Sequence, residues 1–154
     1  MKWLTCVVAL LLFGNNTLRA ENVSISKDDM VKFVKEALDF AKTQGKEVSL
    51  KEFTDGSQFK RDGGELYIYA YDFEGNCIAH GSKSALVGKN LIAMKDKSGK
   101  DLIRELRDAA KNGEGFVDFH WENPSTKKVE SKLGYVMKVD DSWWLGSGIY
   151  SPQQ

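Results

Sequence analysis

The aromatic C-terminal third, residues 113–150, constrains the fold of this chain more than any other stretch. Trp, Tyr and Phe recur along it, as in three antiparallel strands that follow one another. Asn-Pro-Ser-Thr at 123–126 and Asp-Asp-Ser at 140–142 supply residue types that favour turns and divide the strands. A sheet this aromatic closes a core or lines a pocket, so the functional question is which of the two applies.

An amphipathic helix is predicted between Ser26 and Gly45. Ser26 can cap the free amides, aspartates occupy the first turn, and Gly45 is a natural stop. Ser49 and Glu52 match a capping box, which predicts that a short second helix starts there. The apolar positions of the first helix recur at helical spacing and require a surface to pack on. They are Met30, Phe33, Val34, Ala37, Leu38 and Ala41.

The middle of the chain predicts a strand pair followed by a crossover. Residues 65–72 alternate aliphatic side chains with tyrosines, and residues 77–80 return as a second strand after the turn at 74–76. The pattern loosens over 81–100, and residues 101–112 then form a helix. This order predicts an α+β domain on a five-stranded antiparallel sheet. The first helix covers one face of the sheet and the crossover closes the other.

Length and charge bound the function. The 154 residues suffice for one domain, and 42% hydrophobic with 29% charged residues is a globular composition. Lys and Arg balance Asp and Glu, so the formal net charge is zero. This balance lacks the basic footprint of a nucleic-acid binder, and we expect no nucleic-acid partner.

Residues 1–20 have the layout of a secretory signal peptide. Lys2 precedes an apolar run over 3–13, which is too short for a stable membrane anchor. We therefore expect an exported domain over residues 21–154, periplasmic or secreted and not an integral membrane protein. Without the leader Cys77 is the only cysteine, so no internal disulfide is expected.

The residues give little support for catalysis or for a metal. Cys77 and His80 stand three apart on a predicted strand, which places them on opposite faces and argues against a nucleophile–base pair. Ser147 lies within a strand rather than at a nucleophile elbow. His80 and His120 lack paired ligand spacing, and residues 96–101 read as a turn rather than a calcium loop. We expect no metal and no cofactor.

A small-molecule pocket fits the aromatic strands better. Such pockets are mostly apolar and aromatic with a few convergent polar groups, and Tyr69, His80, Trp121, Lys132 and Tyr135 supply that mixture. A lysine in an aromatic cavity suits a carboxylate, to which a His or Tyr can add a hydrogen bond. Strict alternation places Lys132 and Tyr135 on opposite faces. Both can line one pocket only if a bulge forms between them, at a glycine.

Seven short segments carry a resemblance in the same order as in one known family. They are residues 69–80, 86–90, 96–100, 113–117, 121–124, 132–136 and 146–150. Together they resemble a single Cache domain of the second type, and the similarity spans residues 28–150.

The resemblance implies a PAS-like extracytoplasmic sensor, with a long N-terminal helix on a five-stranded antiparallel sheet. Small organic acids or amines then bind between the sheet and the crossover. His80, Trp121, Lys132 and Tyr135 fall at motif positions of the family, whereas Tyr69 rests on strand geometry alone. Family members usually sit between two membrane helices, which we do not find here. We therefore expect signalling to need a membrane-bound receptor or sensor partner.

Our hypothesis is an exported, stand-alone Cache-type domain that binds a small organic ligand, a carboxylate by preference, without catalysis. Two alternatives stay open. One is a structural or interaction module, in which the aromatic face is only core. The other is a small enzyme on a cystatin-like scaffold with His80 or His120 as base. We assign Phe119, Trp143 and Trp144 to packing.

Overall fold

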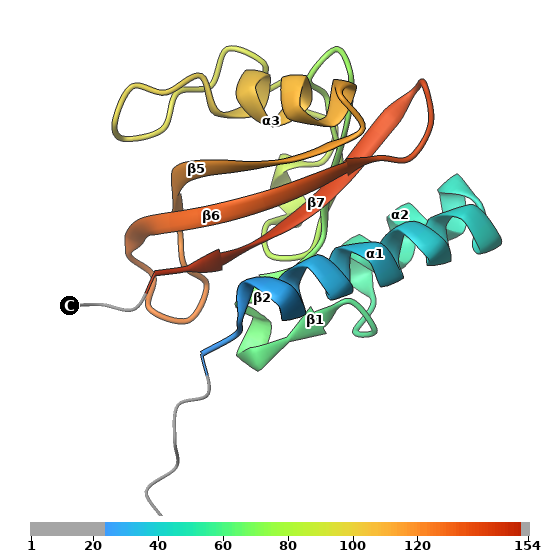
Figure 1. The fold of residues 1–154 in the computed structure, drawn as a ribbon, viewed down its shortest axis with the longest axis horizontal. Coiled ribbons are helices and arrows are strands. Elements are labelled where there is room, and N and C mark those ends of the chain that lie inside the picture. The colour runs from blue at the N-terminus through green and yellow to red at the C-terminus, as the bar shows by residue number, and fades with distance from the viewer. Residues whose placement is uncertain (1–23, 152–154) are drawn as a thin grey trace, which may run out of the picture.

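In the computed structural model, which describes residues 24–151, helices cover both faces of a five-stranded antiparallel sheet (Figure 1). The spatial order of the strands is β4-β3-β7-β6-β5. The fold therefore confirms the predicted α+β architecture and its three closing strands. The strands are β3 (Tyr69–Asp72), β4 (Cys77–His80), β5 (Glu114–Glu122), β6 (Val129–Lys138) and β7 (Trp143–Tyr150).

Helix α1 (Lys27–Gln44) packs along one face of the sheet, where its six predicted apolar residues are all buried. The Ser26 hydroxyl accepts a hydrogen bond from the Asp29 amide at 3.1 Å, and the Asp29 carboxylate accepts one from the Ser26 amide at 3.3 Å. This reciprocal cap starts the helix. Gly45 ends it with a positive φ of 82°. Trp143 packs in this same layer, as predicted.

Helix α2 (Lys46–Asp55) has its N-cap at Gly45, four residues before the predicted cap at Ser49. Gly45 ends α1 and is also the N-cap of α2, so the chain changes direction at one residue. Ser49 therefore lies inside the helix, where its hydroxyl donates to the Gly45 carbonyl at 2.7 Å. The capping-box prediction was wrong, because a Ser-x-x-Glu spacing also fits a helix interior.

The predicted strand over residues 65–72 is divided at Ile68 into β2 (Leu66–Tyr67) and β3. Strand β2 pairs with β1 (Lys60–Arg61), which the sequence did not predict, across the short turn at Asp62–Gly64. The predicted alternation holds across the division. Three aliphatic side chains face α1, and three tyrosines face the opposite layer.

Strand β4 carries a bulge that overturns one prediction. Ala70 pairs with Ala79 but Tyr71 pairs with Cys77, so Ile78 is the extra residue. The bulge puts Cys77 and His80 on the same face of the sheet, rather than on opposite faces. Simple alternation fails here because β4 has one more residue than β3 between these two pairs, so the side chains beyond Ile78 change face.

The crossover, residues 81–101, and helix α3 (Leu102–Lys111) cover the tyrosine face. Leu102, Ile103, Leu106 and Ala110 are buried there, as predicted. Trp144 packs in this second layer. Figure 1 shows α3 on the side of the sheet opposite to α1 and α2.

No helix among residues 24–151 is long and apolar enough to cross a membrane. The predicted leader, residues 1–20, falls outside the described residues, and the division at residue 21 stays a prediction.

Candidate ligand-binding site

A small cavity lies between the tyrosine face of the sheet and α3. Its volume, counted as the space open to the centre of a water molecule, is about 10 Å³, room for about one water. The lining is aromatic and aliphatic, with one lysine and one histidine. It consists of Tyr67, Tyr69, Tyr71, His80, Leu102, Ile103, Leu106, Phe119, Trp121 and Lys132.

Four of the five predicted site residues meet in this cavity. Tyr69 comes from β3, His80 from β4, Trp121 from β5 and Lys132 from β6. Tyr69 and His80 are direct partners across the β3–β4 pair, and the ring centres of His80 and Trp121 lie 5.9 Å apart. Side chains from four strands thus converge on one cavity. In the sequence, each of them lies in a separate segment that resembles any other strand.

Tyr135 lies on the opposite face of the sheet, in the layer beneath α1. The pairing of β6 with β7 runs from Lys132 to Lys138 without interruption, so no bulge forms at Gly134. The Tyr135 hydroxyl donates to a Glu114 carboxylate oxygen at 2.7 Å, and its ring lies 4.7 Å from that of Phe116. Its placement in the pocket was therefore wrong, because strict alternation holds.

Lys132 is the only lysine or arginine of the described lining, and it is 1% exposed. Its Nζ donates to the hydroxyls of Tyr67 at 3.0 Å and Tyr150 at 3.2 Å. The ring centres of these tyrosines lie 4.2 and 4.6 Å from Nζ. Among residues 24–151, no carboxylate forms an ion pair with it. Burial lowers the pKa of Lys132 to about 7.

His80 is held as a neutral donor. Its Nδ1 accepts hydrogen bonds from the amides of Ser82 at 3.3 Å and Lys83 at 3.0 Å. A ring nitrogen that accepts carries no proton, so Nε2 holds the proton of the neutral ring. Burial lowers the pKa of His80 most, and the positive charges of Lys132 and Lys83 lower it further, to about 3. His80 therefore stays uncharged at neutral pH.

The remaining polar groups complete a site made of donors. The buried Nε1–H of Trp121 has no hydrogen-bond partner among the described residues. The Tyr69 hydroxyl donates to the Ser147 carbonyl at 3.0 Å. No Asp or Glu belongs to the described lining. A cavity with a cation, neutral N–H donors and no carboxylate is chemically suited to an anion.

Sequence reasoning missed several residues of the site. Tyr67 belongs to the same alternating row of tyrosines as Tyr69, so this alternation could have predicted that Tyr67 also lines the cavity. Tyr150 was not singled out, because its contact with Lys132 depends on the β6–β7 register. Phe119, assigned to packing, is buried and also lines the cavity. The leucines and isoleucine of α3 had been assigned only to a helix face.

Comparison with known proteins agrees with this architecture. Residues 17–152 match the family described as Single Cache domain 2. A methyl-accepting chemotaxis protein from Vibrio parahaemolyticus RIMD 2210633 has 34% identity and a TM-score of 0.56. That match covers 78% of this chain and 80% of the other.

Two further relatives extend the comparison. A Cache chemosensory domain solved for its recognition of carboxylic acids has a TM-score of 0.61 at 21% identity, over 80% of this chain and 86% of that one. At this identity the likeness concerns the fold alone. The sensor histidine kinase MctS of Rhizobium johnstonii is 36% identical over 89 residues. These are 57% of this chain but only 19% of the kinase.

Proposed function

The chain belongs to the Single Cache domain 2 family, and on this premise we propose that it is an extracytoplasmic sensor module for a small carboxylate. The ligand is bound in the cavity beneath α3 and is not chemically converted. The family consists of sensor and ligand-binding modules related to chemotaxis receptors and sensor kinases. The fold does not determine which ligand is bound, so we infer the class of ligand from the residues of the cavity.

The observation that carries the proposal is the buried ammonium group of Lys132. A buried charge is costly unless an opposite charge and hydrogen bonds compensate it. Two tyrosine hydroxyls supply hydrogen bonds, and Glu65 acts on the ammonium group from beyond ion-pair distance, but no described carboxylate supplies a negative charge in direct contact. A ligand carboxylate would supply it.

The neutral donors define how such a ligand is held. The Nε2–H of His80 and the Nε1–H of Trp121 can each donate to an anion. A ligand ammonium group would find no carboxylate in the described lining. The site therefore favours carboxylates over amines and amino acids.

The small volume limits the ligand further. About 10 Å³ holds one water molecule, so even a two- or three-carbon acid requires the walls to separate. A domain of the same fold recognises carboxylic acids, which is compatible with the proposed class of ligand, but the proposal rests on the cavity of this chain.

Signalling is proposed to occur through a membrane-bound receptor or sensor protein. The similar proteins are a chemotaxis protein and a sensor histidine kinase. The match covers about a fifth of the length of the kinase. The domain would present its ligand-bound surface to such a protein.

A thermal-shift comparison tests the proposed ligand class. The folded protein is heated with acetate, propionate or pyruvate, and with propionamide and ethylamine as controls of similar size. We expect a rise in melting temperature with the carboxylates alone, because they bind the native state. An equal rise with propionamide or ethylamine, or no rise with any acid, would reject the proposal.

A further inference from the structure

The crossover is fastened to both edges of the sheet, but by different kinds of bond. At the β4 edge two backbone bonds tie residues 88 and 89 to Cys77, in addition to the bonds from the Ser82 and Lys83 amides to His80 Nδ1. The Cys77 amide donates to the Lys89 carbonyl at 2.9 Å, and the Gly88 amide donates to the Cys77 carbonyl at 2.8 Å. The two backbone bonds extend the sheet and do not depend on side-chain identity.

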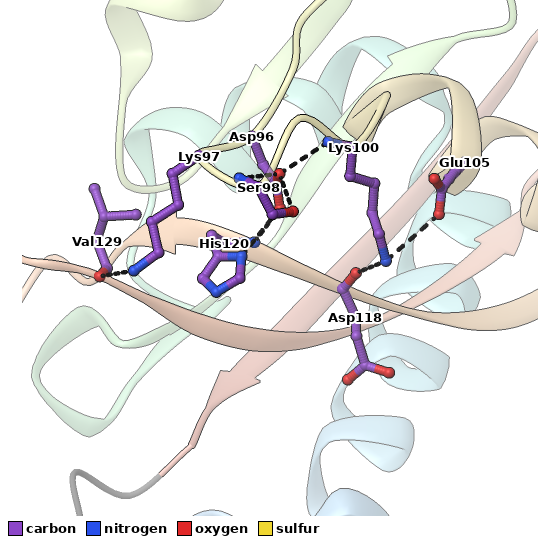
Figure 2. A network of polar contacts seen from close by, with 8 residues as sticks. All are labelled: Asp96, Lys97, Ser98, Lys100, Glu105, Asp118, His120 and Val129. Carbon is purple, nitrogen blue, oxygen red and sulfur yellow. Dashed lines mark hydrogen bonds and ion pairs between the residues drawn. The ribbon is translucent and has the colours of Figure 1, made fainter.

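At the β5 edge the fastening is made by side chains (Figure 2). Asp96 Oδ2 accepts from the His120 amide at 2.9 Å and contacts His120 Nδ1 at 3.2 Å. The ammonium group of Lys100 donates to the Asp118 carbonyl. The Asp96 side chain is 0% exposed, so the main attachment is shielded from water.

The other oxygen of the same carboxylate shapes the turn before α3. Asp96 Oδ1 accepts from the Ser98 amide at 2.8 Å, the Ser98 hydroxyl at 2.6 Å and the Lys100 amide at 3.1 Å. Desolvation raises the pKa of Asp96, but hydrogen bonds from Ser98, His120 and Lys100 outweigh it and hold the pKa well below its usual range. Asp96 is thus a charged acceptor with two separate tasks, one for each oxygen.

This attachment joins two walls of the cavity. His120 precedes Trp121 on β5, and the turn of Asp96 leads directly into Leu102 at the start of α3. Trp121 and Leu102 both line the cavity. Movement of the turn away from β5 would widen that space, whereas the backbone bonds would hold the β4 end in place.

We propose that Asp96 is a positioning residue for the ligand cavity, and that release of its bond to His120 is the step that opens the cavity. The functional part of this inference rests on the proposed carboxylate binding. The closed arrangement observed is then the state in which Asp96 holds α3 against β5.

Asp96→Asn separates the two tasks of the carboxylate. The amide oxygen can still accept from Ser98 and Lys100, but its NH₂ group then faces the His120 amide and leaves two donors opposed. Ser98→Ala is the matched control, because it removes one hydrogen bond of the turn and leaves the bond to His120 intact. Lys100→Met weakens the same edge through Asp118 and serves if the Asn variant does not fold.

Hydrogen exchange of the ligand-free protein is the first readout. Asp96→Asn should speed exchange of the His120 amide and of amides 98–103 by about tenfold or more, as expected for loss of a charge-assisted hydrogen bond. Ser98→Ala should change these rates much less. Unchanged rates in the Asn variant would overturn the proposal, whether or not any ligand binds.

Propionate binding followed by tryptophan fluorescence in stopped flow is the second readout. The ligand must pass through the open state both to enter and to leave the cavity. The association and dissociation rates of the Asn variant should therefore both rise by about tenfold, with a smaller change in Kd. Damage to the cavity alone would raise the dissociation rate without raising the association rate, and this result would overturn the proposal. If the unaltered protein does not bind propionate, the proposed function fails, and hydrogen exchange alone decides the role of Asp96.

Discussion

Lys132 lies beneath the ring of Tyr67, with Nζ 3.0 Å from the hydroxyl oxygen and 4.2 Å from the ring centre. One tyrosine therefore provides both a hydrogen bond and a cation–π contact to the same ammonium group. Both contacts are with a neutral side chain, and among the described residues the positive charge has no ion-pair partner. On the proposed function this charge is available to a ligand anion, and its burial lowers the stability of the ligand-free fold.

Replacing Lys132 with Met should stabilise the ligand-free fold below pH 7, because the substitution removes a buried charge. The pKa of Lys132 is lowered from 10.5 to about 7. Between these values the unfolded chain holds a proton that the folded protein lacks, so the stability of the unaltered protein rises with pH by about 1.4 kcal/mol per unit. The advantage of the Met variant should therefore shrink over this window.

Denaturant titrations of both proteins at pH 6, 8 and 10 measure this difference. A stability difference that stays constant across the three pH values would contradict the burial of Lys132 in the cavity without an ion-pair partner among the described residues.

Carboxylate affinity should fall with pH above about 7. A bound anion favours the protonated form of Lys132, whereas burial alone favours the neutral form. Binding then takes up a proton, and Kd rises about tenfold per pH unit until the lysine of the complex itself loses its proton. Calorimetry in buffers with different ionisation enthalpies measures the uptake. Binding without uptake at pH 8 would argue that Lys132 does not hold the anion.

The ring of His80 should not titrate between pH 5 and 8. Its Nδ1 is occupied by the amides of Ser82 and Lys83, and its pKa is lowered to about 3. Nitrogen NMR of the two histidines should show His80 as the neutral form with the proton on Nε2 throughout this range. A titration midpoint near 6.5 would show that the ring is not held as the structure has it.

Tyr135→Phe should leave carboxylate affinity within about twofold, because Tyr135 lies on the α1 side of the sheet. The variant loses the 2.7 Å hydrogen bond to Glu114, so its free energy of unfolding should be lower by about 1 kcal/mol. Denaturation and ligand titration of the same sample separate the two effects. Weakened binding with unchanged stability would place Tyr135 back at the site.

Gly134→Ala should reduce carboxylate binding by about tenfold or more. A methyl group at Gly134 would lie 2.7 Å from Phe119 Cε1 and 3.0 Å from the Tyr69 hydroxyl, so the rings that line the cavity must shift. Overpacking of this kind costs about 1–3 kcal/mol. Tyr135→Phe is the control for a neighbouring change on the other face. Unaltered affinity in the Ala variant would mean that the ligand does not contact this wall.

Much of the fold follows from local patterns in the sequence. The 3.6-residue periodicity after Ser26 and the alternation around Tyr69 each reflect a face that must be buried, and both were read correctly. Errors arose where one pattern serves two structures. The Ser49 spacing fits a helix interior as well as a cap, and the bulge beside Cys77 inverts the alternation without any glycine or proline at Ile78.

The site was predictable only in part, because a cavity is made by contacts that are distant in sequence. Tyr69, His80, Trp121 and Lys132 were found through the polar and aromatic residues of separate strands. The contact of Tyr150 with Lys132 depends on strand register instead. The attachment of Asp96 to His120 joins a turn to a strand edge 24 residues away, and no local pattern indicates it.

Calorimetric titration of the unaltered protein and of Lys132→Met with propionate at pH 6.5 tests the central claim most directly. With a pKa of about 7, Lys132 is mostly protonated at this pH, so the unaltered protein should bind one propionate per chain. The Met variant, though folded and stable, should bind none measurably. Undiminished binding of propionate by the Met variant would contradict the account, because the anion would then be held without the buried ammonium group.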